Sequence, residues 1–277
     1  MKKLLYAIAG LSLVASAYSC SMFEYDNYPG PDAQVTGKLL DVKTGEKIGI
    51  ETAQTSSFDW STWSTVTKTD GALVVIEQGW DAEADQDWLV RYDGQYTNNI
   101  VFAGTYKFTT KKLPCYEVEE NNEFTLKKGK NKMNISLLPF CRIVSPSISY
   151  DASSKKIVAT FYVELGDPER ANNISNVALC GNTQLFVGCN YQNLAKNDGG
   201  AKKQNVKPGE LITLEIDTTS PSNGDLFKYT QDRYVRIAAM AGGNGFNGNN
   251  YYNFSPVYKI SADFSTIEEV VWDENEW

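Results

Sequence analysis

Two tryptophans and a carboxylate lie within the short segment 58–63, which reads FDWSTW. Aromatic rings stack against the C–H faces of sugars, while carboxylates and amides hydrogen-bond to sugar hydroxyls. The neighbouring residues are rich in Ser and Thr and offer little apolar surface for a core. Trp60, Trp63 and Asp59 are therefore candidate ligand-binding residues, provided that they point outward. The competing interpretation, which is the more common one for such residues, is that the tryptophans cover the side of a first β-sheet.

A second pair of tryptophans, Trp80 and Trp88, flanks the acidic segment 81–87 and adds two ligand-binding candidates. Oxygen ligands alternate along this segment, and Ca²⁺ takes about six to eight of them. The segment lacks the glycine and the distal glutamate of an EF-hand loop, so a solvated acidic loop is the favoured interpretation. The candidate calcium ligands are Asp81, Glu83, Asp85 and Asp87.

The segment 244–252, which reads NGFNGNNYY, has the composition of an interaction loop. Tyrosine and asparagine supply adaptable contacts, and glycine and asparagine tolerate left-handed turns. Tyr251 and Tyr252 are therefore further ligand-binding candidates. A flexible hairpin tip would have the same composition, and this is the simpler interpretation.

The chain of 277 residues contains no histidine. This excludes Ser-His-Asp and Cys-His catalysis, histidine-ligated zinc and histidine acid–base chemistry. Paired carboxylates could still hydrolyse glycosides, but none of the 34 acidic residues stands in a recognisable motif. We therefore expect a protein that is not an enzyme and has no cofactor. The net charge of −8 repels phosphate backbones, so nucleic acid is not an expected partner.

The first twenty residues predict membrane attachment through lipid. Two lysines precede the apolar run 4–14, which is too short to cross a bilayer, and small residues then lead to Cys20. This arrangement is typical of a bacterial lipoprotein signal, so we expect residues 1–19 to be removed and Cys20 to carry the lipid. Ala17 stands where such signals prefer leucine. The alternative is an ordinary secretory signal cut near Ala17, with Cys20 in a disulfide.

Four cysteines follow Cys20, and an even number permits disulfides in an exported chain. We expect strands over 177–180 and 184–187, so that Cys180 and Cys189 could face one another on a hairpin. Cys115 and Cys141 flank the last expected strand of the first domain. All three connectivities are open. Zinc binding by the four cysteines is disfavoured, because no CxxC pair is present.

Short strands bounded by Gly and Asp run through the sequence, and helical periodicity is not evident. Residues 20–33 are polar and proline-containing and read as a flexible tether. Residues 34–141 carry paired strands around turns such as Thr44-Gly45 and Asp70-Gly71. Residues 142–272 carry about seven strands, the number typical of an immunoglobulin-like or fibronectin type III sandwich. We predict an all-β protein with two β-sandwich domains and an acidic tail over 273–277.

The segment 35–48, VTGKLLDVKTGEKI, resembles the opening of transthyretin-like domains of the carboxypeptidase-regulatory type. The segments 69–71 and 103–106 fit the same pattern. In the second half, 233–239 followed by 252–258 is similar to the closing strands of a fibronectin-type module. Behind a lipoprotein signal, this combination resembles the two-domain Bacteroides lipoproteins of the unknown-function family numbered 3823.

The resemblance implies a transthyretin-like N-terminal sandwich and an immunoglobulin/fibronectin III-like C-terminal sandwich. Such lipoproteins are commonly encoded beside SusC/SusD-type glycan importers. The resemblance therefore implies an accessory role in polysaccharide capture, with a polysaccharide or oligosaccharide and SusC/SusD-type proteins as partners. The alternative is a structural or docking subunit that binds an outer-membrane protein and no sugar. No binding residues can be transferred from the family.

Acidic residues directly after the lipidated cysteine favour surface export in Bacteroides lipoproteins. Glu24 and Asp26 provide them here, displaced by Ser21, Met22 and Phe23. We therefore expect a lipid-anchored outer-membrane protein that is exposed at the cell surface. The sequence leaves the choice between the two leaflets open.

Overall fold

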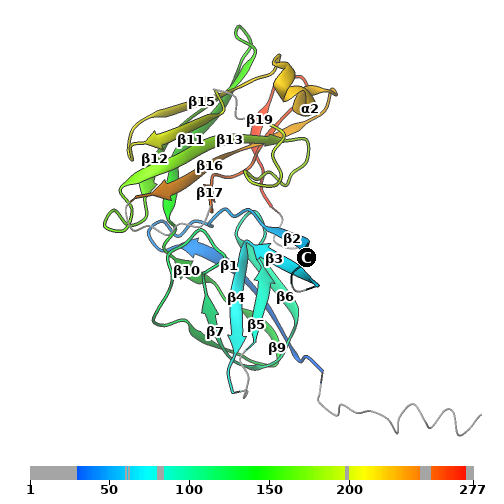
Figure 1. The fold of residues 1–277 in the computed structure, drawn as a ribbon, viewed down its shortest axis with the longest axis vertical. Coiled ribbons are helices and arrows are strands. Elements are labelled where there is room, and N and C mark those ends of the chain that lie inside the picture. Colours follow the sequence, from blue (N-terminus) through cyan, green and yellow to red (C-terminus); the bar gives the residue numbers. More distant parts are fainter. Residues whose placement is uncertain are drawn as a thin grey trace, which may run out of the picture.

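The computed structural model describes residues 30–59, 61, 63–79, 84–196, 200–243 and 251–272. Figure 1 shows two β-structured regions that follow one another along the long axis of the molecule. We call them the N-terminal region, residues 30–140, and the C-terminal region, residues 141–272. Almost all regular structure is strand, so the predicted all-β fold class is confirmed. The predicted signal segment, Cys20 and the acidic tail lie outside the described residues.

The described part of the N-terminal region contains three sheets. Its strands are β1 (Ala33–Asp41), β2 (Ala53–Asp59), β3 (Ser64–Asp70), β4 (Ala72–Glu77), β5 (Asp85–Leu89), β6 (Gln95–Val101), β7 (Gly104–Thr109), β8 (Glu123–Leu126), β9 (Gly129–Lys132) and β10 (Ile135–Leu137). One sheet has the order β10-β1-β6, with β9 also paired to β1; the second is β2-β3, and the third is β5-β4-β7-β8. Strand β1 runs antiparallel to β6 and parallel to β9 and β10.

Alternation along β1 shows how the sequence selects the buried face. Val35 and Leu39 are fully buried, whereas Gln34 and Thr36 are exposed. Successive side chains of a strand point to opposite faces, so one apolar residue in two is enough to build a core. Val35 and Leu39 join a single apolar cluster with Leu73 from the opposing sheet. The turn predicted at Thr44-Gly45 is confirmed, and Gly45 has the left-handed φ of 73° that such a turn requires.

The C-terminal region contains two sheets in its described part. Its elements are β11 (Cys141–Asp151), β12 (Lys156–Leu165), β13 (Asn173–Asn182), β14 (Lys202–Val206), β15 (Ile212–Asp217), the 3-10 turn η1 (Pro221–Asn223), α2 (Gly224–Phe227), β16 (Arg233–Gly242), β17 (Asn253–Phe254), β18 (Tyr258–Ile260) and β19 (Ile267–Glu269). One sheet is β11-β12-β15 and the other is β14-β13-β16-β18-β19, with β17 paired to β16. Neither helix in the described part of the chain is long and apolar enough to span a bilayer.

Strand β16 is buried on both of its faces. Val235 and Ile237 pack with residues of β12 and β15 in the core between the two sheets. Ala238, on the opposite face, belongs to a second apolar cluster that also contains Val187 and Phe254. This second cluster lies on the side of the sheet that faces the N-terminal region. The junction between the regions is therefore built on the outer face of β16.

Two local predictions differ from the structure. The segment 184–187, predicted as a strand, is part of an irregular loop, because the Asn182 side chain donates hydrogen bonds to the carbonyl oxygens of Phe186 and Gln192 and folds the chain back. The short helical segment 221–227 was not expected either.

Pro146 stands inside β11, where the pairing with β12 is irregular between Val144 and Ser147, and bulges of this kind are where strands tolerate proline.

Candidate functional site

Trp63 is an exposed aromatic residue on the turn between β2 and β3. Its exposed fraction is 74%, and its φ of 53° lies in the left-handed region, which costs a residue with a side chain about 1–2 kcal/mol. Asp59 ends β2 and pairs in register with Ser64 of β3, so the predicted outward-facing platform lies at a hairpin turn. Trp60 lies outside the described residues. The Trp63 ring is therefore largely exposed to solvent at the end of the hairpin.

Trp88 is a core residue, and its prediction as a ligand contact is wrong. Its exposed fraction is 3%, and its ring centroid lies 5.9 Å from that of Phe124 and 6.0 Å from that of Tyr106. On β5 the neighbours Asp87 and Leu89 face outward, so the period of two turns Trp88 inward. Trp80, the other tryptophan beside the acidic segment, lies outside the described residues.

Asp85 and Asp87 form ion pairs with lysines instead of converging on a cation. The Lys112 Nζ lies 2.7 Å from Asp87 Oδ2, and Lys111 contacts Asp85 in the same way. The calcium alternative, which the sequence already disfavoured, is therefore not supported at these two residues. Asp81 and Glu83 lie outside the described residues. Among the residues that the structure does describe, no group of three or more acidic or cysteine side chains is arranged to hold a metal ion.

The two tyrosines of the predicted interaction loop face inward. Tyr252 is buried and packs beside Phe254 in the second C-terminal cluster, so its prediction as a ligand contact is wrong. The Tyr251 hydroxyl donates a hydrogen bond to Asp70 Oδ1 at 3.0 Å, and the Tyr191 hydroxyl donates to Asp70 Oδ2 at 2.7 Å. This contact raises the pKa of Tyr191 to about 12. Tyr251 therefore joins the C-terminal region to the N-terminal region, and its role as a ligand contact stays a prediction.

The four described cysteines form no disulfide, so the predicted pairings are not present. Cys180 and Cys189 do meet, since their thiols are hydrogen-bonded to one another, and this contact raises the pKa of Cys180. Cys115 packs in the core of the N-terminal region. The Cys141 thiol instead donates to the Ala239 carbonyl oxygen at 3.4 Å within the C-terminal region. Cys115 and Cys141 therefore belong to different cores.

Arg236 is the centre of the junction, and sequence analysis did not single it out. It lies on the outer face of β16 with 1% of its surface exposed, and its guanidinium lies 4.2 Å above the Phe254 ring. Burial lowers the pKa of Arg236 to about 10, which leaves it charged at neutral pH. The signal in the sequence is an arginine in the apolar interior of β16, a strand that also begins with a buried arginine, Arg233. The Arg236 guanidinium donates to four main-chain carbonyl oxygens, those of Tyr92 (2.7 Å), Ser255 (2.9 Å), Ile50 (3.0 Å) and Val187 (3.3 Å).

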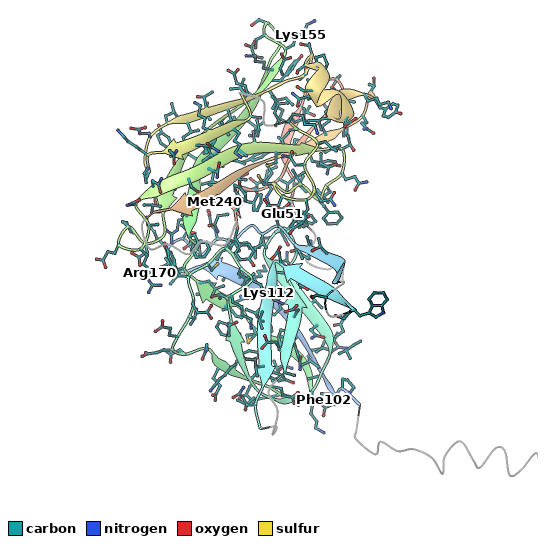
Figure 2. All side chains as sticks on the ribbon, viewed as in Figure 1. Glu51, Phe102, Lys112, Lys155, Arg170 and Met240 are labelled. Atoms are coloured by element: carbon teal, nitrogen blue, oxygen red, sulfur yellow. The ribbon has the colours of Figure 1, made fainter. Side chains whose placement is uncertain are left out.

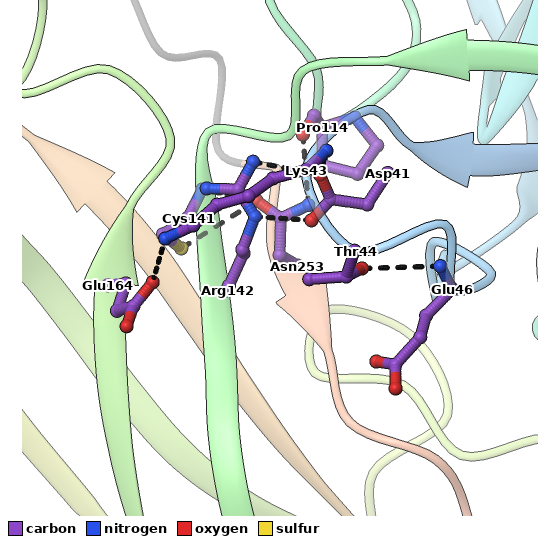
Figure 3. Close-up of polar contacts among 9 residues, drawn as sticks. All are labelled: Asp41, Lys43, Thr44, Glu46, Pro114, Cys141, Arg142, Glu164 and Asn253. Atoms are coloured by element: carbon purple, nitrogen blue, oxygen red, sulfur yellow. Dashed lines mark hydrogen bonds and ion pairs between the residues drawn. The ribbon is translucent and has the colours of Figure 1, made fainter.

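A buried ion pair between Asp41 and Arg142 also joins the two regions (Figure 3). The guanidinium holds the carboxylate with two hydrogen bonds, and the one from Nη2 to Oδ1 measures 2.8 Å. Beside it, the Asn253 side-chain amide donates to the Pro114 carbonyl oxygen at 2.9 Å. Planar, two-pronged contacts of this kind specify both distance and orientation. The relative placement of the two regions is therefore strongly determined here.

Glu51 provides a third contact across the junction. Figure 2 shows it at the boundary between the regions, with Phe102 and Lys155 near opposite ends of the molecule. Its carboxylate accepts hydrogen bonds from the backbone N–H groups of Asn190, at 3.0 and 3.1 Å, and Tyr191, at 2.9 Å. The irregular loop that replaces the predicted strand is thus held by a carboxylate of the other region.

A groove with a volume of about 1170 Å³ runs along this junction. Its walls are the turn 42–49 of the N-terminal region, the start of β11, the segment 253–258 and residues 269–272. Both regions contribute walls, and the Asp41–Arg142 pair lies among them. The groove therefore exists only in the assembled two-region structure.

Basic and acidic side chains line the groove in equal number, but most of the basic ones are paired with acceptors of the protein itself. Three of the five lining cations are held by carboxylates, and Arg236 is held by carbonyl oxygens. Among the described residues, the carboxylates of Glu46 and Glu269 have no lysine or arginine nitrogen within 4.0 Å. The three ion pairs are Lys43–Glu164 (2.8 Å), Lys47–Asp93 (3.1 Å) and Arg142–Asp41, and the remaining cation is Lys38.

Aromatic side chains lie at one end of the groove. Trp272 lines it and is partly exposed, and the Arg91 guanidinium lies 4.9 Å from its ring centroid. Phe186 is half exposed, with its centroid 6.1 Å from Trp272 and 5.4 Å from Tyr92. Trp272, Glu46 and Glu269 all line the groove, so an aromatic ring and hydrogen-bond acceptors are among its lining groups. Such a combination suits the binding of a molecule with both C–H faces and hydroxyl groups.

Comparison with known proteins gives one family and several similar structures. The family model "Protein of unknown function (DUF3823) N-terminal domain" matches residues 33–138. A protein from Bacteroides uniformis, named a "putative carbohydrate binding protein", is 30% identical, and the match covers 84% of this chain and 100% of that chain with a TM-score of 0.66. No curated protein matches the chain.

Two further structures are similar in fold. A DUF3823 family protein from Parabacteroides merdae is 20% identical, with a TM-score of 0.62, and the match covers 83% of this chain and 99% of that chain. Another, from Bacteroides ovatus, is 19% identical with a TM-score of 0.60 and the same coverage. Both matches extend over the N-terminal and C-terminal regions together.

Proposed function

The chain belongs to the DUF3823 family, and on that basis we propose that it is a non-catalytic glycan-binding accessory of the cell envelope. In this proposal, lipid on Cys20 holds the chain at the outer membrane, and the folded regions capture polysaccharide for a SusC/SusD-type importer. The relative from Bacteroides uniformis that is 30% identical over its whole length supports the glycan as ligand.

The observation that carries the proposal is the exposed ring of Trp63. A large apolar side chain on a hairpin turn contributes little to the core, yet it offers a flat face to solvent. Sugar rings present flat C–H faces that stack on such a ring. Because one face of one tryptophan covers only a short stretch of a glycan, capture through Trp63 would be weak at each site and would suit a long polymer.

Affinity gel electrophoresis tests this function. The full chain, purified in a detergent without a sugar headgroup, is run through native gels that contain single polysaccharides. We expect retardation by at least one polysaccharide, and we expect Trp63→Ala to weaken binding about tenfold, the loss of roughly 1.4 kcal/mol. Tyr229→Ala, which removes another exposed ring from the C-terminal region, is the matched control and should leave the retardation unchanged.

Two outcomes would contradict the proposal. Mobility that is the same with and without every polysaccharide tested would exclude glycan capture. Co-purification with an outer-membrane importer that survives Trp63→Ala, without any glycan binding, would favour the docking role in its place. The anchor is tested separately, because Cys20→Ala should release the chain from the membrane fraction.

A further inference from the structure

We propose that the junction groove is a second glycan site, and that it accepts uncharged oligosaccharides and excludes acidic ones. This inference rests on the proposed glycan-binding function and assigns a ligand class to a place in the molecule different from Trp63. Three features of the groove carry it: its size, the availability of its charges and the aromatic end at Trp272.

The size of the groove suits several sugar rings. Pockets for drug-sized ligands measure about 300–1,000 Å³, and the junction groove measures about 1170 Å³. Its walls are held in place by the Asp41–Arg142 pair and by the hydrogen bonds of Arg236. A site whose walls are already ordered loses little conformational freedom when it binds. The groove is therefore suited to an oligosaccharide segment, which is itself flexible.

The availability of charge determines which glycans can enter. Lys43, Lys47 and Arg142 are each paired with a carboxylate of the protein, and Lys38, the remaining lysine of the groove, also has an interaction of its own, so much of the positive charge is already engaged. Glu46 and Glu269 line the same groove without an ion-pair partner among the described residues. A uronate or a sulfated sugar would meet these carboxylates as a like charge, which is unfavourable. Sugar hydroxyls, in contrast, donate hydrogen bonds to carboxylates.

The aromatic end supplies the apolar contact that a neutral sugar needs. Trp272 lines the groove, and the Arg91 guanidinium stacked at 4.9 Å restricts its orientation. Phe186 lies next to Trp272 and extends the aromatic surface outward. Glu269 and Trp272 both line the groove, so its lining contains a hydrogen-bond acceptor and an aromatic ring. Sugar recognition by protein side chains usually combines these two kinds of group.

Isothermal titration calorimetry with defined oligosaccharides tests the site. The full chain, in a detergent without a sugar headgroup, is titrated with maltohexaose, cellohexaose, xylohexaose and mannohexaose, and with hexagalacturonate as the acidic probe. We expect at least one neutral hexasaccharide to bind and hexagalacturonate not to bind. Trp272→Ala and Glu269→Gln should each weaken that binding about tenfold. Glu268→Gln, on the same strand but outside the groove, should leave it unchanged.

The results separate this inference from the proposed function. If polysaccharides retard the chain through Trp63 but Trp272→Ala and Glu269→Gln leave hexasaccharide affinity unchanged, the groove inference alone is wrong. Tighter binding of hexagalacturonate than of every neutral hexasaccharide would also overturn it. If neither polymers nor hexasaccharides bind, both proposals fail. Glu269→Gln preserves side-chain shape, so an unchanged melting temperature will show that a lost affinity does not come from misfolding.

Discussion

The junction groove and the β2–β3 turn are both candidate binding places, and they are built in opposite ways. The junction is held by buried charged groups, with Arg236 and the Asp41–Arg142 pair at its centre. The turn carries an exposed tryptophan on a two-stranded sheet. Binding in the junction groove is therefore coupled to folding, because the walls of the groove exist only when the two regions are joined. At the β2–β3 turn, in contrast, Trp63 can be substituted without disturbing the core.

Arg236→Ala should produce the largest effect on stability. It removes the donor for carbonyl oxygens of both regions, among them Ile50 and Tyr92, and leaves them buried without their partner. Each buried acceptor left without its donor costs about 1–3 kcal/mol, so the loss over several carbonyl oxygens should reach about 3–5 kcal/mol. Denaturant unfolding should show this loss and should separate the transitions of the two regions. Lys203→Ala, at an exposed lysine of β14, is the control. A loss below about 1 kcal/mol would contradict the central role of Arg236.

Arg142→Ala should follow with a loss of about 3 kcal/mol, because it leaves the Asp41 carboxylate buried without its cation. The double variant Asp41→Leu with Arg142→Met should recover most of that loss, since apolar pairs replace buried ion pairs at little cost. Denaturant unfolding of Asp41→Leu, of Arg142→Met and of the double variant measures the coupling free energy between the two residues. Additive losses in the double variant would show that the two residues act independently.

High pH should loosen the contact between Tyr191 and Asp70. The hydrogen bond to the Asp70 carboxylate raises the pKa of Tyr191 from 10.0 to about 12. The stabilisation from a group with a raised folded pKa is complete below the unfolded value, so it should be full below pH 10 and should be lost as the pH rises through 12. Unfolding free energies between pH 9 and pH 12 should show this loss, and Tyr191→Phe should reduce the slope. A slope that Tyr191→Phe leaves unchanged would assign the effect to other groups, such as Tyr251.

Trp63→Ala should have the smallest effect on stability, within about 0.5 kcal/mol, because the side chain is mostly exposed. Thermal unfolding measures it, with Trp88→Ala as the opposite case at a core tryptophan. The same Trp63 variant should lose glycan retardation, so binding and folding would separate at the turn. A large loss of stability would show that Trp63 packs against the protein and would remove the contrast with the junction.

Much of the strand pattern could be predicted, since alternation is a local property. The strands β1 (Ala33–Asp41) and β15 (Ile212–Asp217) alternate between buried and more exposed side chains, as a strand with one apolar face requires. The outward orientation of Trp63 was one of two alternatives, and its exposed fraction of 74% agrees with it, whereas its role in ligand binding stays a prediction. Trp88 was misassigned because its acidic neighbours suggested a loop, whereas Asp85 and Asp87 occupy the exposed face of β5.

The chain by itself determines which segments become strands and which faces of them are apolar, because those choices depend on neighbours two residues apart. Only the tertiary structure decides what lies between the two regions. The Arg236 guanidinium donates hydrogen bonds to the carbonyl oxygen of Ile50, 186 residues away in the sequence, and to that of Tyr92, 144 residues away. No local pattern reports such partners, since a buried cation is stable only when carbonyl oxygens from distant segments converge on it. The groove forms where these distant segments meet, and Glu46 and Glu269 are among its lining residues.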